Sequence, residues 1–232
     1  SKIYDLQNSS RSRFYKKILH PKEGLEIWSS TSTTLPKEIT KEEFDKGPVL
    51  NRFEHQLNKS GLITKNVLKP NFNWSCEDIS NLKSIYKLEK YIILFPFSSA
   101  HLTIKRWPFY NELIQKIKEK FENKYQLVVA PGPNEIKIAN EIDAKIILNN
   151  ERALNISQLS TLIKDSSFVI ANDTGPAHMA AHLNAKGLVL FGSHTTAKKV
   201  SIERENFRAI QVSDLTKLSA DKVFQRMQEA IT

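Results

Sequence analysis

Short apolar runs alternate with amphipathic stretches from Tyr91 onward, and this alternation constrains the fold more than any other feature of the chain. Strands are predicted near residues 91–97, 126–131, 145–149, 167–172, 187–192 and 207–212, and helices near 107–122, 133–141, 157–165, 176–184 and 219–230. Strands that alternate with helices form βαβ units around a parallel sheet. Because such crossovers are right-handed, the predicted class is α/β, with a doubly wound, Rossmann-like layer.

Residues 1–90 follow a different pattern. Helices are predicted around residues 9–19, 48–61 and 76–87, and the stretch from Pro21 to Pro48 is expected to be irregular. No parallel sheet is expected from this part alone. The predicted organisation is therefore an irregular, mostly helical segment at 1–88, followed by a Rossmann-like domain at 89–232.

Composition narrows the class of protein. Hydrophobic residues make up 40% of the 232 residues and charged residues 25%, which is typical of a soluble globular chain. No run approaches the roughly 20 apolar residues of a membrane span, and the start of the chain resembles no signal peptide. The chain does not begin with Met, which indicates a cut or processed product. The single cysteine, Cys76, excludes an internal disulfide and a Cys-based zinc site, and favours a reducing, cytoplasmic setting.

The net charge of +9 indicates an affinity for polyanions, which include nucleic acids, anionic lipids and phosphorylated glycolipids. A solvated lysine-rich surface explains the same charge without a partner. No signature of an RNA-binding module or zinc finger is present, so a basic nucleic-acid-binding protein is the weakest of the alternatives.

The run from Phe168 to Leu183 predicts a buried strand, a polar turn at residues 172–175 and a helix that opens on Pro176. Proline suits the first position of a helix, and Asn172, Asp173 and Thr174 are each suited to capping its free amides. A helix N-terminus at the carboxyl end of a parallel strand favours a bound phosphate. The alternative is an ordinary, well-capped turn, because the glycine-rich phosphate fingerprint is missing.

Two further strand ends carry polar residues. Ser98, Ser99, Lys105 and Arg106 follow the strand at 91–97, and Glu135 follows the strand at 126–131. A cation and hydroxyls there are suited to a diphosphate, and a carboxylate is suited to ribose hydroxyls. Solvated serines, a basic surface and a helix-dipole role for the glutamate are the alternatives. Positive charge beside the N-terminus of the predicted helix 107–122 is unfavourable without an anion, which favours a ligand.

Taken in order, these motifs resemble the C-terminal domain of the ADP-heptose–lipopolysaccharide heptosyltransferases, glycosyltransferase family 9. The family has a Ser/Thr loop before Lys-x-Trp-Pro, then Gly-x-x-x-Glu or a close variant, then Asn/Asp-Asp-Ser/Thr-Gly-x-x-His-x-x-Ala-Ala, and finally a strand ending in Phe-Gly. The resemblance runs from about residue 90 to the C-terminus. Residues 4–15 resemble a segment near the end of the family's N-terminal domain, which makes residues 1–88 its remnant and linker.

The resemblance implies the C-terminal half of a GT-B type enzyme and a set of residues that bind the nucleotide sugar. That set is Ser98, Ser99, Lys105, Glu135, Asp173, Thr174, Gly175 and His178, with Lys105 as the catalytic stabiliser of the diphosphate leaving group. Trp107 is assigned to core packing, with stacking on a base as the alternative. The family's catalytic base lies in a glycine-rich loop of the N-terminal domain, so it is absent from this chain.

No metal and no cofactor are expected. The sequence contains no Asp-x-Asp motif. His178 and His182 have the spacing of a metal-binding helix, but Met179 replaces the glutamate of a zinc protease and no third ligand is apparent.

The resulting prediction is an inverting, metal-independent glycosyltransferase that moves a heptose from ADP-heptose, or a related nucleotide sugar, to the lipopolysaccharide inner core. The enzyme would be cytoplasmic, with peripheral contact at the inner membrane and no nucleic-acid partner. The alternative is a non-catalytic nucleotide-binding or interaction module that kept the cleft and lost the chemistry.

Overall fold

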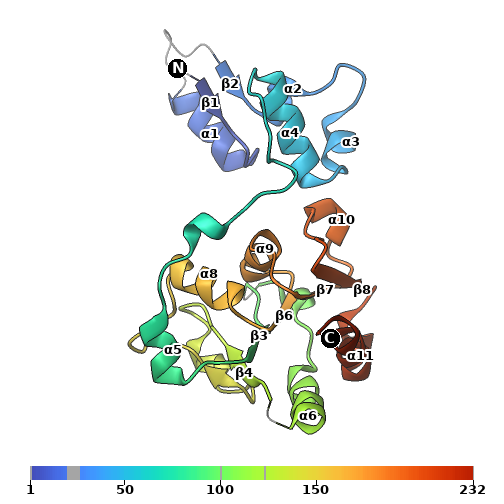
Figure 1. The fold of residues 1–232 in the computed structure, drawn as a ribbon. Helices are drawn as coiled ribbons and strands as arrows, with labels where there is room; N and C mark the ends of the chain where they lie inside the picture. Colours follow the sequence, from blue (N-terminus) through green and yellow to red (C-terminus); the bar gives the residue numbers. More distant parts are fainter. Residues whose placement is uncertain (1, 20–26, 100, 123, 232) are drawn as a thin grey trace. The chain divides into compact units, whose positions relative to one another are not determined.

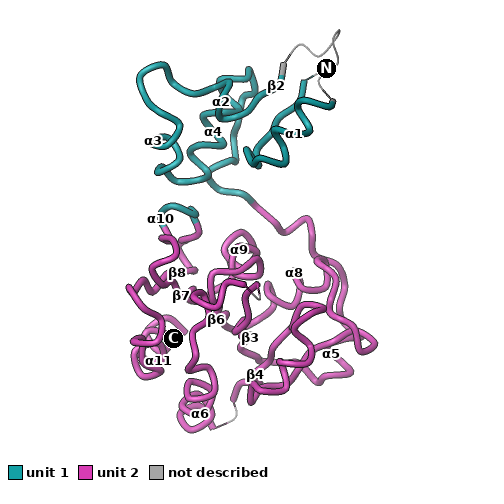
Figure 2. The backbone as a smooth tube through the Cα atoms, turned by 180° about the vertical axis from the view of Figure 1, so that it is seen from behind, with its two compact units in different colours: residues 1–70, 198–201 teal, residues 71–197, 202–232 magenta. Residues whose placement is uncertain are grey.

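The computed structural model describes residues 2–19, 27–99, 101–122 and 124–231. The chain forms two compact units: unit 1 contains residues 1–70 and 198–201, and unit 2 contains residues 71–197 and 202–232 (Figure 2). Residues 71–88, with the short helix η1 (Asn73–Ser75) and α5 (Ser80–Tyr86), group with unit 2. The predicted domain boundary at residue 88 stays a prediction.

Unit 2 is built on a six-stranded parallel sheet in the order β5-β4-β3-β6-β7-β8 (Figure 1). The strands are β3 (Tyr91–Phe95), β4 (Gln126–Val129), β5 (Lys145–Ile146), β6 (Phe168–Asn172), β7 (Gly187–Phe191) and β8 (Phe207–Gln211). This arrangement confirms the predicted α/β class, and each strand falls within its predicted range. The chain winds outward in both directions from the neighbouring strands β3 and β6, so a crevice opens between their carboxyl ends.

The helices of unit 2 cover both faces of this sheet. Besides η1 and α5, they are α6 (Tyr110–Phe121), α7 (Ile136–Ala139), α8 (Ile156–Lys164), α9 (Gly175–His182) and α11 (Ala220–Ile231), with the short helices η2 (Thr103–Lys105) and η3 (Leu215–Lys217). Most of α10 (Ala197–Val200) groups with unit 1. α6 packs against α11 on one side of the sheet, and α8 packs against α9 on the other (Figure 1).

Several helices of unit 2 are shorter than predicted. The helix expected at 76–87 is α5, which begins only at Ser80. α6 begins at Tyr110, three residues later than expected, and Pro108 accounts for the first of these residues because it disfavours a helical conformation at Trp107. α7 begins late as well, since residues 132–135 form a turn before it. α7 also ends two residues early, at Ala139, but these differences affect only helix ends, so the order of elements is unchanged.

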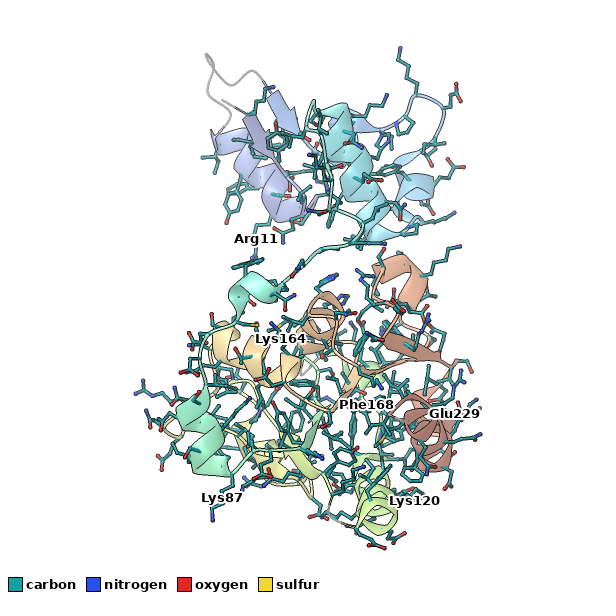
Figure 3. The ribbon with its side chains drawn as sticks, in the orientation of Figure 1. Arg11, Lys87, Lys120, Lys164, Phe168 and Glu229 are labelled. Atoms are coloured by element: carbon teal, nitrogen blue, oxygen red, sulfur yellow. The ribbon has the colours of Figure 1, made fainter. Side chains whose placement is uncertain are left out.

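The core follows the two-residue period of the strands. Alternate residues pack with α6 and α11, among them Ile92, Leu94, Phe168 and Ile170. Phe168 lies inside the unit, whereas Lys87, Lys120 and Glu229 lie on its outside (Figure 3). The strand residues between the members of this core are also buried, so both faces of the sheet are covered, as parallel sheets require.

Trp107 is 2% exposed and donates its indole N–H to the Leu218 carbonyl at 2.7 Å. This confirms the core-packing role that the sequence predicts. The packing is tight elsewhere too: a Cβ on Gly187 would lie 2.4 Å from the Val169 carbonyl, which explains the glycine in β7.

Unit 1 corrects two predictions. β1 (Lys2–Tyr4) and β2 (Ile27–Ser29) precede and follow α1 (Ser10–Leu19) in the sequence and pair with each other in parallel. This part therefore does contain a parallel sheet, of two strands. The stretch from Pro21 to Pro48 is not irregular where the structure describes it, because β2, α2 (Thr31–Thr34) and α3 (Lys41–Asp45) lie within it. Three- to five-residue elements carry too little periodicity to be read from sequence. The predicted helix at 48–61 is confirmed as α4 (Val49–Lys59).

Buried polar side chains hold unit 1 together. Gln56 on α4 is 1% exposed, and its amide nitrogen lies 3.0 Å from the Asp5 carbonyl and 3.2 Å from the Ser29 carbonyl. Its side-chain oxygen accepts from Asn8, which in turn accepts from the Thr31 N–H. Gln56 therefore connects α4 to the ends of both strands.

Candidate functional site

A cavity of about 460 Å³ opens in unit 2, at the carboxyl ends of β3, β4 and β6. All eight site residues that the sequence predicts line it: Ser98, Ser99, Lys105, Glu135, Asp173, Thr174, Gly175 and His178. They come from three loops that are far apart in the chain. The order of the strands brings these loops together at the point where open α/β sheets bind ligands.

Asn172, the last residue of β6, joins two of these loops. It is fully buried, and its side-chain nitrogen donates to the Pro96 carbonyl at 2.7 Å. Its side-chain oxygen accepts from the backbone N–H of Trp107 and from the Tyr110 hydroxyl, each at 3.3 Å. The predicted capping role of this side chain is therefore wrong. Its hydrogen bonds fix the end of β3 beside the end of β6, where the cavity opens.

The start of α9 faces the cavity without a side-chain cap. Thr174 occupies the N-cap position, but its hydroxyl donates to the Asn172 carbonyl at 3.3 Å and makes no capping hydrogen bond to the helix. The predicted capping by Asn172, Asp173 and Thr174 is thus not observed. A Cβ on Gly175 would meet no atom of the described residues within 4 Å. The uncapped helix start and the open space beside Gly175 suit an incoming anion.

Asp173 lies at the centre of a charged cluster. Its carboxylate is 5% exposed, and Lys105 Nζ and His194 Nε2 lie 2.7 and 3.0 Å from its Oδ2. His178 Nε2 lies 3.5 Å from Oδ1. Burial raises the pKa of Asp173, but the hydrogen bonds from His178, Lys105 and His194 and the charge of Lys105 outweigh burial and hold its pKa well below the usual range. The carboxylate is therefore ionised and is a weak proton acceptor.

Lys105 and Arg106 separate in the structure. Lys105 ends η2, lines the cavity and pairs with Asp173, whereas Arg106 turns away and donates to the Ser98 carbonyl at 2.9 Å and its hydroxyl at 3.3 Å. α6 begins at Tyr110, so neither cation lies in its first turn. The prediction that these cations interact unfavourably with the dipole of α6 was wrong. Lys105 remains a candidate ligand contact because it lines the cavity.

The two serines of this loop also differ. Ser98 is 5% exposed, and its hydroxyl donates to the Leu102 carbonyl at 3.0 Å. Ser99 is exposed, and its carbonyl accepts from the Leu102 N–H at 2.8 Å. Ser98 therefore shapes the loop, and of the two hydroxyls the one on Ser99 has the easier access to a ligand.

Glu135 stands at the N-cap of α7 and accepts from the Gly132 N–H at 2.9 Å through Oε2. This hydrogen bond holds the carboxylate beside the carboxyl end of β4, where it lines the cavity. The apolar side chains of Pro131, Leu154 and Leu159 line the same cavity. A carboxylate beside apolar walls is a suitable arrangement for a ribose and its base.

His182 does not share a ligand with His178. Its Nδ1 lies 3.2 Å from an Arg204 guanidinium nitrogen, and burial, together with the charges of Arg204 and His178, lowers the pKa of His182 to about 4. Within the described ranges, no group of three or more His, Cys, Asp or Glu side chains is placed to hold a metal ion. In the same ranges, no helix is both long and apolar enough to cross a bilayer.

His194 is a member of the cluster that sequence reasoning missed. It lies two residues past Gly192, beyond the end of β7 and so at the same edge of the sheet as the other site loops. The rule that located the other residues, polar side chains just past the carboxyl end of a buried strand, would have found it.

Comparison with known proteins identifies the family and the fold. The sequence matches the family description "Glycosyltransferase family 9 (heptosyltransferase)" over residues 3–227. A search of curated proteins found no match. Similar solved structures include Escherichia coli heptosyltransferase WaaC with ADP-2-deoxy-2-fluoro heptose, with a TM-score of 0.57 and 16% identity over 78% of this chain and 55% of that one.

Two further structures cover more of the chain. E. coli ADP-heptose LPS heptosyltransferase II has a TM-score of 0.66 and 18% identity, over 97% of this chain and 74% of that one. The family 9 glycosyl transferase of Veillonella parvula has a TM-score of 0.71 and 13% identity, over 100% of this chain and 73% of that one. The chain thus spans between 55% and 74% of these proteins.

The six-stranded parallel sheet with helices on both faces defines the class as an α/β fold that resembles GT-B glycosyltransferase domains. Within that class, the chain belongs to glycosyltransferase family 9, the heptosyltransferase family.

Proposed function

We propose that this chain is the nucleotide-sugar-binding part of an inverting heptosyltransferase. The observation that carries the proposal is the cavity at the crevice between β3 and β6, which gathers a lysine, a carboxylate and an uncapped helix start. The donor would be ADP-heptose or a related nucleotide sugar. The structures of WaaC with ADP and with a fluorinated ADP-heptose, in a protein of similar fold, support this choice of donor.

In the proposed complex, the diphosphate lies between Lys105 and the start of α9. The ammonium already faces the cavity and keeps donors to spare while one is used on Asp173. Preorganised positive charge stabilises the negative charge that develops on a departing diphosphate, and such stabilisation often contributes more to catalysis than any other effect. Glu135 would accept from the ribose hydroxyls, and the apolar wall would receive the base.

Transfer would proceed by direct displacement. An acceptor hydroxyl of the lipopolysaccharide inner core attacks the anomeric carbon, the bond to the diphosphate breaks, and the proton of the hydroxyl passes to a general base. The two described carboxylates that line the cavity, Asp173 and Glu135, are poor candidates for that base. The partners of Asp173 hold its pKa well below the usual range, which makes it a weak proton acceptor, and Glu135 accepts a hydrogen bond from Gly132. We infer that the base comes from a domain that precedes this chain in the family.

The proposed reaction is metal-independent, since lysine, hydroxyls and the helix start supply the stabilisation. The net charge of +9 supports attraction to a phosphorylated glycolipid and peripheral contact with the inner membrane from the cytoplasm. The rival proposal is a non-catalytic nucleotide-binding module. The hydrogen bonds that occupy both carboxylates support this module as well as they support an enzyme whose base lies elsewhere.

The first test is a thermal-shift panel of ADP, UDP, GDP and CMP in EDTA. ADP should stabilise the protein by about 2.7 kcal/mol at a hundredfold excess over its dissociation constant. A shift that appears only after magnesium is added would contradict the metal-free proposal.

Two variants assign the loops. Lys105→Ala should weaken ADP binding by roughly 1.5–3 kcal/mol and leave adenosine binding almost unchanged, because a charged hydrogen bond to phosphate is lost. Glu135→Ala should weaken the binding of ADP and adenosine alike. Equal, small losses of both ligands in both variants would show that the loops are misassigned.

A transfer assay separates the enzyme from the module. We expect no heptose transfer by this chain alone, and recovery when the upstream domain is supplied, because general base catalysis contributes ~10²–10⁴-fold. Transfer by the chain alone would show that it contains the base. Persistent inactivity after the domain is supplied, with ADP still bound, would favour the module.

A further inference from the structure

His194 is the one described side chain of the Asp173 cluster to which no role has been assigned, and it is firmly held in place. Its side chain is 9% exposed, and its ring stacks on Phe191 with centroids 5.9 Å apart and planes 18° apart. Its Nδ1 is buried and has no hydrogen-bond partner among the described residues. Packing therefore fixes the ring, and Nε2 is the ring atom that bonds to Asp173.

The hydrogen-bonding roles follow from this geometry. An ionised carboxylate only accepts, so Nε2 of His194 must donate its proton to Asp173 Oδ2 over 3.0 Å. A proton on the buried Nδ1 would leave a donor unpaired, which is costly, whereas a bare Nδ1 leaves only a lone pair. His194 is therefore a fixed single donor.

The two oxygens of Asp173 are left unequal. Oδ2 receives both Lys105, at 2.7 Å, and His194, at 3.0 Å. Among the described residues, Oδ1 has only the longer contact of 3.5 Å to His178, whose side chain is 37% exposed. Since each carboxylate oxygen has about two acceptor positions, Oδ1 is the atom with capacity for a ligand.

We propose that His194 is a positioning residue that holds Asp173 so that Oδ1 accepts a hydrogen bond from a hydroxyl of the donor sugar. This inference rests on the proposed function, namely that the cavity binds a nucleoside diphosphate sugar. Without His194, one of the two donors that fix Oδ2 is lost and the carboxylate turns toward Lys105. The sugar then loses its aligned acceptor, while the nucleotide keeps Lys105, Glu135 and the start of α9.

The test is calorimetric binding of two probes, ADP and ADP-L-glycero-D-manno-heptose, in EDTA. His194→Ala should weaken ADP-heptose binding by about tenfold, the loss expected for one hydrogen bond, and change ADP affinity by less than about twofold. His194→Gln, whose amide restores a donor, should recover most of the loss. His182→Gln serves as the matched control, because His182 is also partly buried in unit 2 but bonds to Arg204; it should change the affinity for neither ligand.

A double-mutant cycle separates positioning from a general effect on folding. In an Asp173→Asn background, His194→Ala should change ADP-heptose affinity by less than about twofold, because the carboxylate through which it acts is gone. Equal losses of ADP and ADP-heptose in His194→Ala, or equal losses with and without Asp173, would overturn the proposal. So would a wild-type protein that binds ADP-heptose no more tightly than ADP. Failure of wild type to bind ADP at all would instead overturn the proposed function, and this inference with it.

Discussion

The two units of this chain are stabilised in opposite ways. Unit 2 buries apolar side chains on both faces of a six-stranded sheet. In unit 1, Trp28 is the one buried apolar side chain among the described residues, and the other buried side chains are polar: Asp5, Ser12, Ser29, Ser30, Thr31 and Gln56. Apolar burial stabilises in proportion to area and requires no exact partner, at about 25 cal/mol per Å². A polar core stabilises only if its hydrogen bonds are made.

The cavity and the polar core therefore belong to different units. All residues that line the cavity lie in unit 2. Damage to unit 1 should therefore leave ADP binding intact, and the following variants test that separation, beginning with the largest expected effect.

The first prediction compares two tryptophans. Trp107→Ala should cost unit 2 about 3–5 kcal/mol of unfolding free energy, because it removes a fully packed ring from the core, and ADP binding should fail with it. Trp28→Ala should destabilise unit 1 and leave ADP affinity unchanged. Urea unfolding followed by circular dichroism, with ADP calorimetry, measures both. Loss of ADP binding in Trp28→Ala would show that the units are coupled.

The second prediction concerns the polar core of unit 1. Gln56→Ala should cost about 1–3 kcal/mol of unfolding free energy, because the carbonyls of Asp5 and Ser29 lose a buried donor. Gln225→Ala, at an exposed glutamine on α11, is the matched control and should stay within about 0.5 kcal/mol of wild type. An equally small effect of Gln56→Ala would mean that water replaces the hydrogen bonds and that the polar core contributes little.

The third prediction uses the titration of His182 in unit 2. Burial and Arg204 lower its pKa from 6.5 to about 4, so below pH 6.5 the unfolded chain takes up a proton that the folded chain refuses. The unfolding free energy should therefore fall between pH 6.5 and 4 and change little further below 4 through this residue. The difference in pKa corresponds to at most ~3 kcal/mol, and solvent screening of the partly exposed ring reduces this to about 1–2 kcal/mol.

Urea unfolding at pH 7 and pH 5 measures the effect. The fall should be smaller in His182→Gln than in wild type by the same amount. Identical pH profiles for the two proteins would contradict the assignment to His182.

The smallest effects concern two glycines. Gly61 follows α4 with a φ of +84°, so Gly61→Ala should cost about 1 kcal/mol in unit 1 through backbone strain and leave ADP affinity unchanged. Gly175→Ala should change stability by less than about 0.5 kcal/mol, since its Cβ would meet no atom, yet weaken ADP binding by occupying space in the cavity. Unchanged ADP affinity in Gly175→Ala would move the diphosphate away from the start of α9.

Much of unit 2 was predictable from the sequence because burial leaves a local signature. The strands at 91–95 and 187–191 and residues 168–171 of β6 are continuous apolar runs, and α6 carries its apolar residues at helical spacing. The site residues were also within reach, since polar residues that follow parallel strands must meet at one edge of the sheet. The polar residues just past Gly192 were not considered, so His194 was missed.

Sequence alone thus determined which segments of unit 2 are strands and helices, and which residue types stand at the strand ends. Tertiary structure alone decided the order of the strands, the parallel pairing of β1 with β2, the hydrogen bonds of Gln56 and the pairing of Lys105 and His194 with one carboxylate. The physical reason is distance along the chain. Periodicity records how each residue is buried within its own segment, whereas Lys105 and Asp173 are 68 positions apart and meet only after β3 and β6 have packed together.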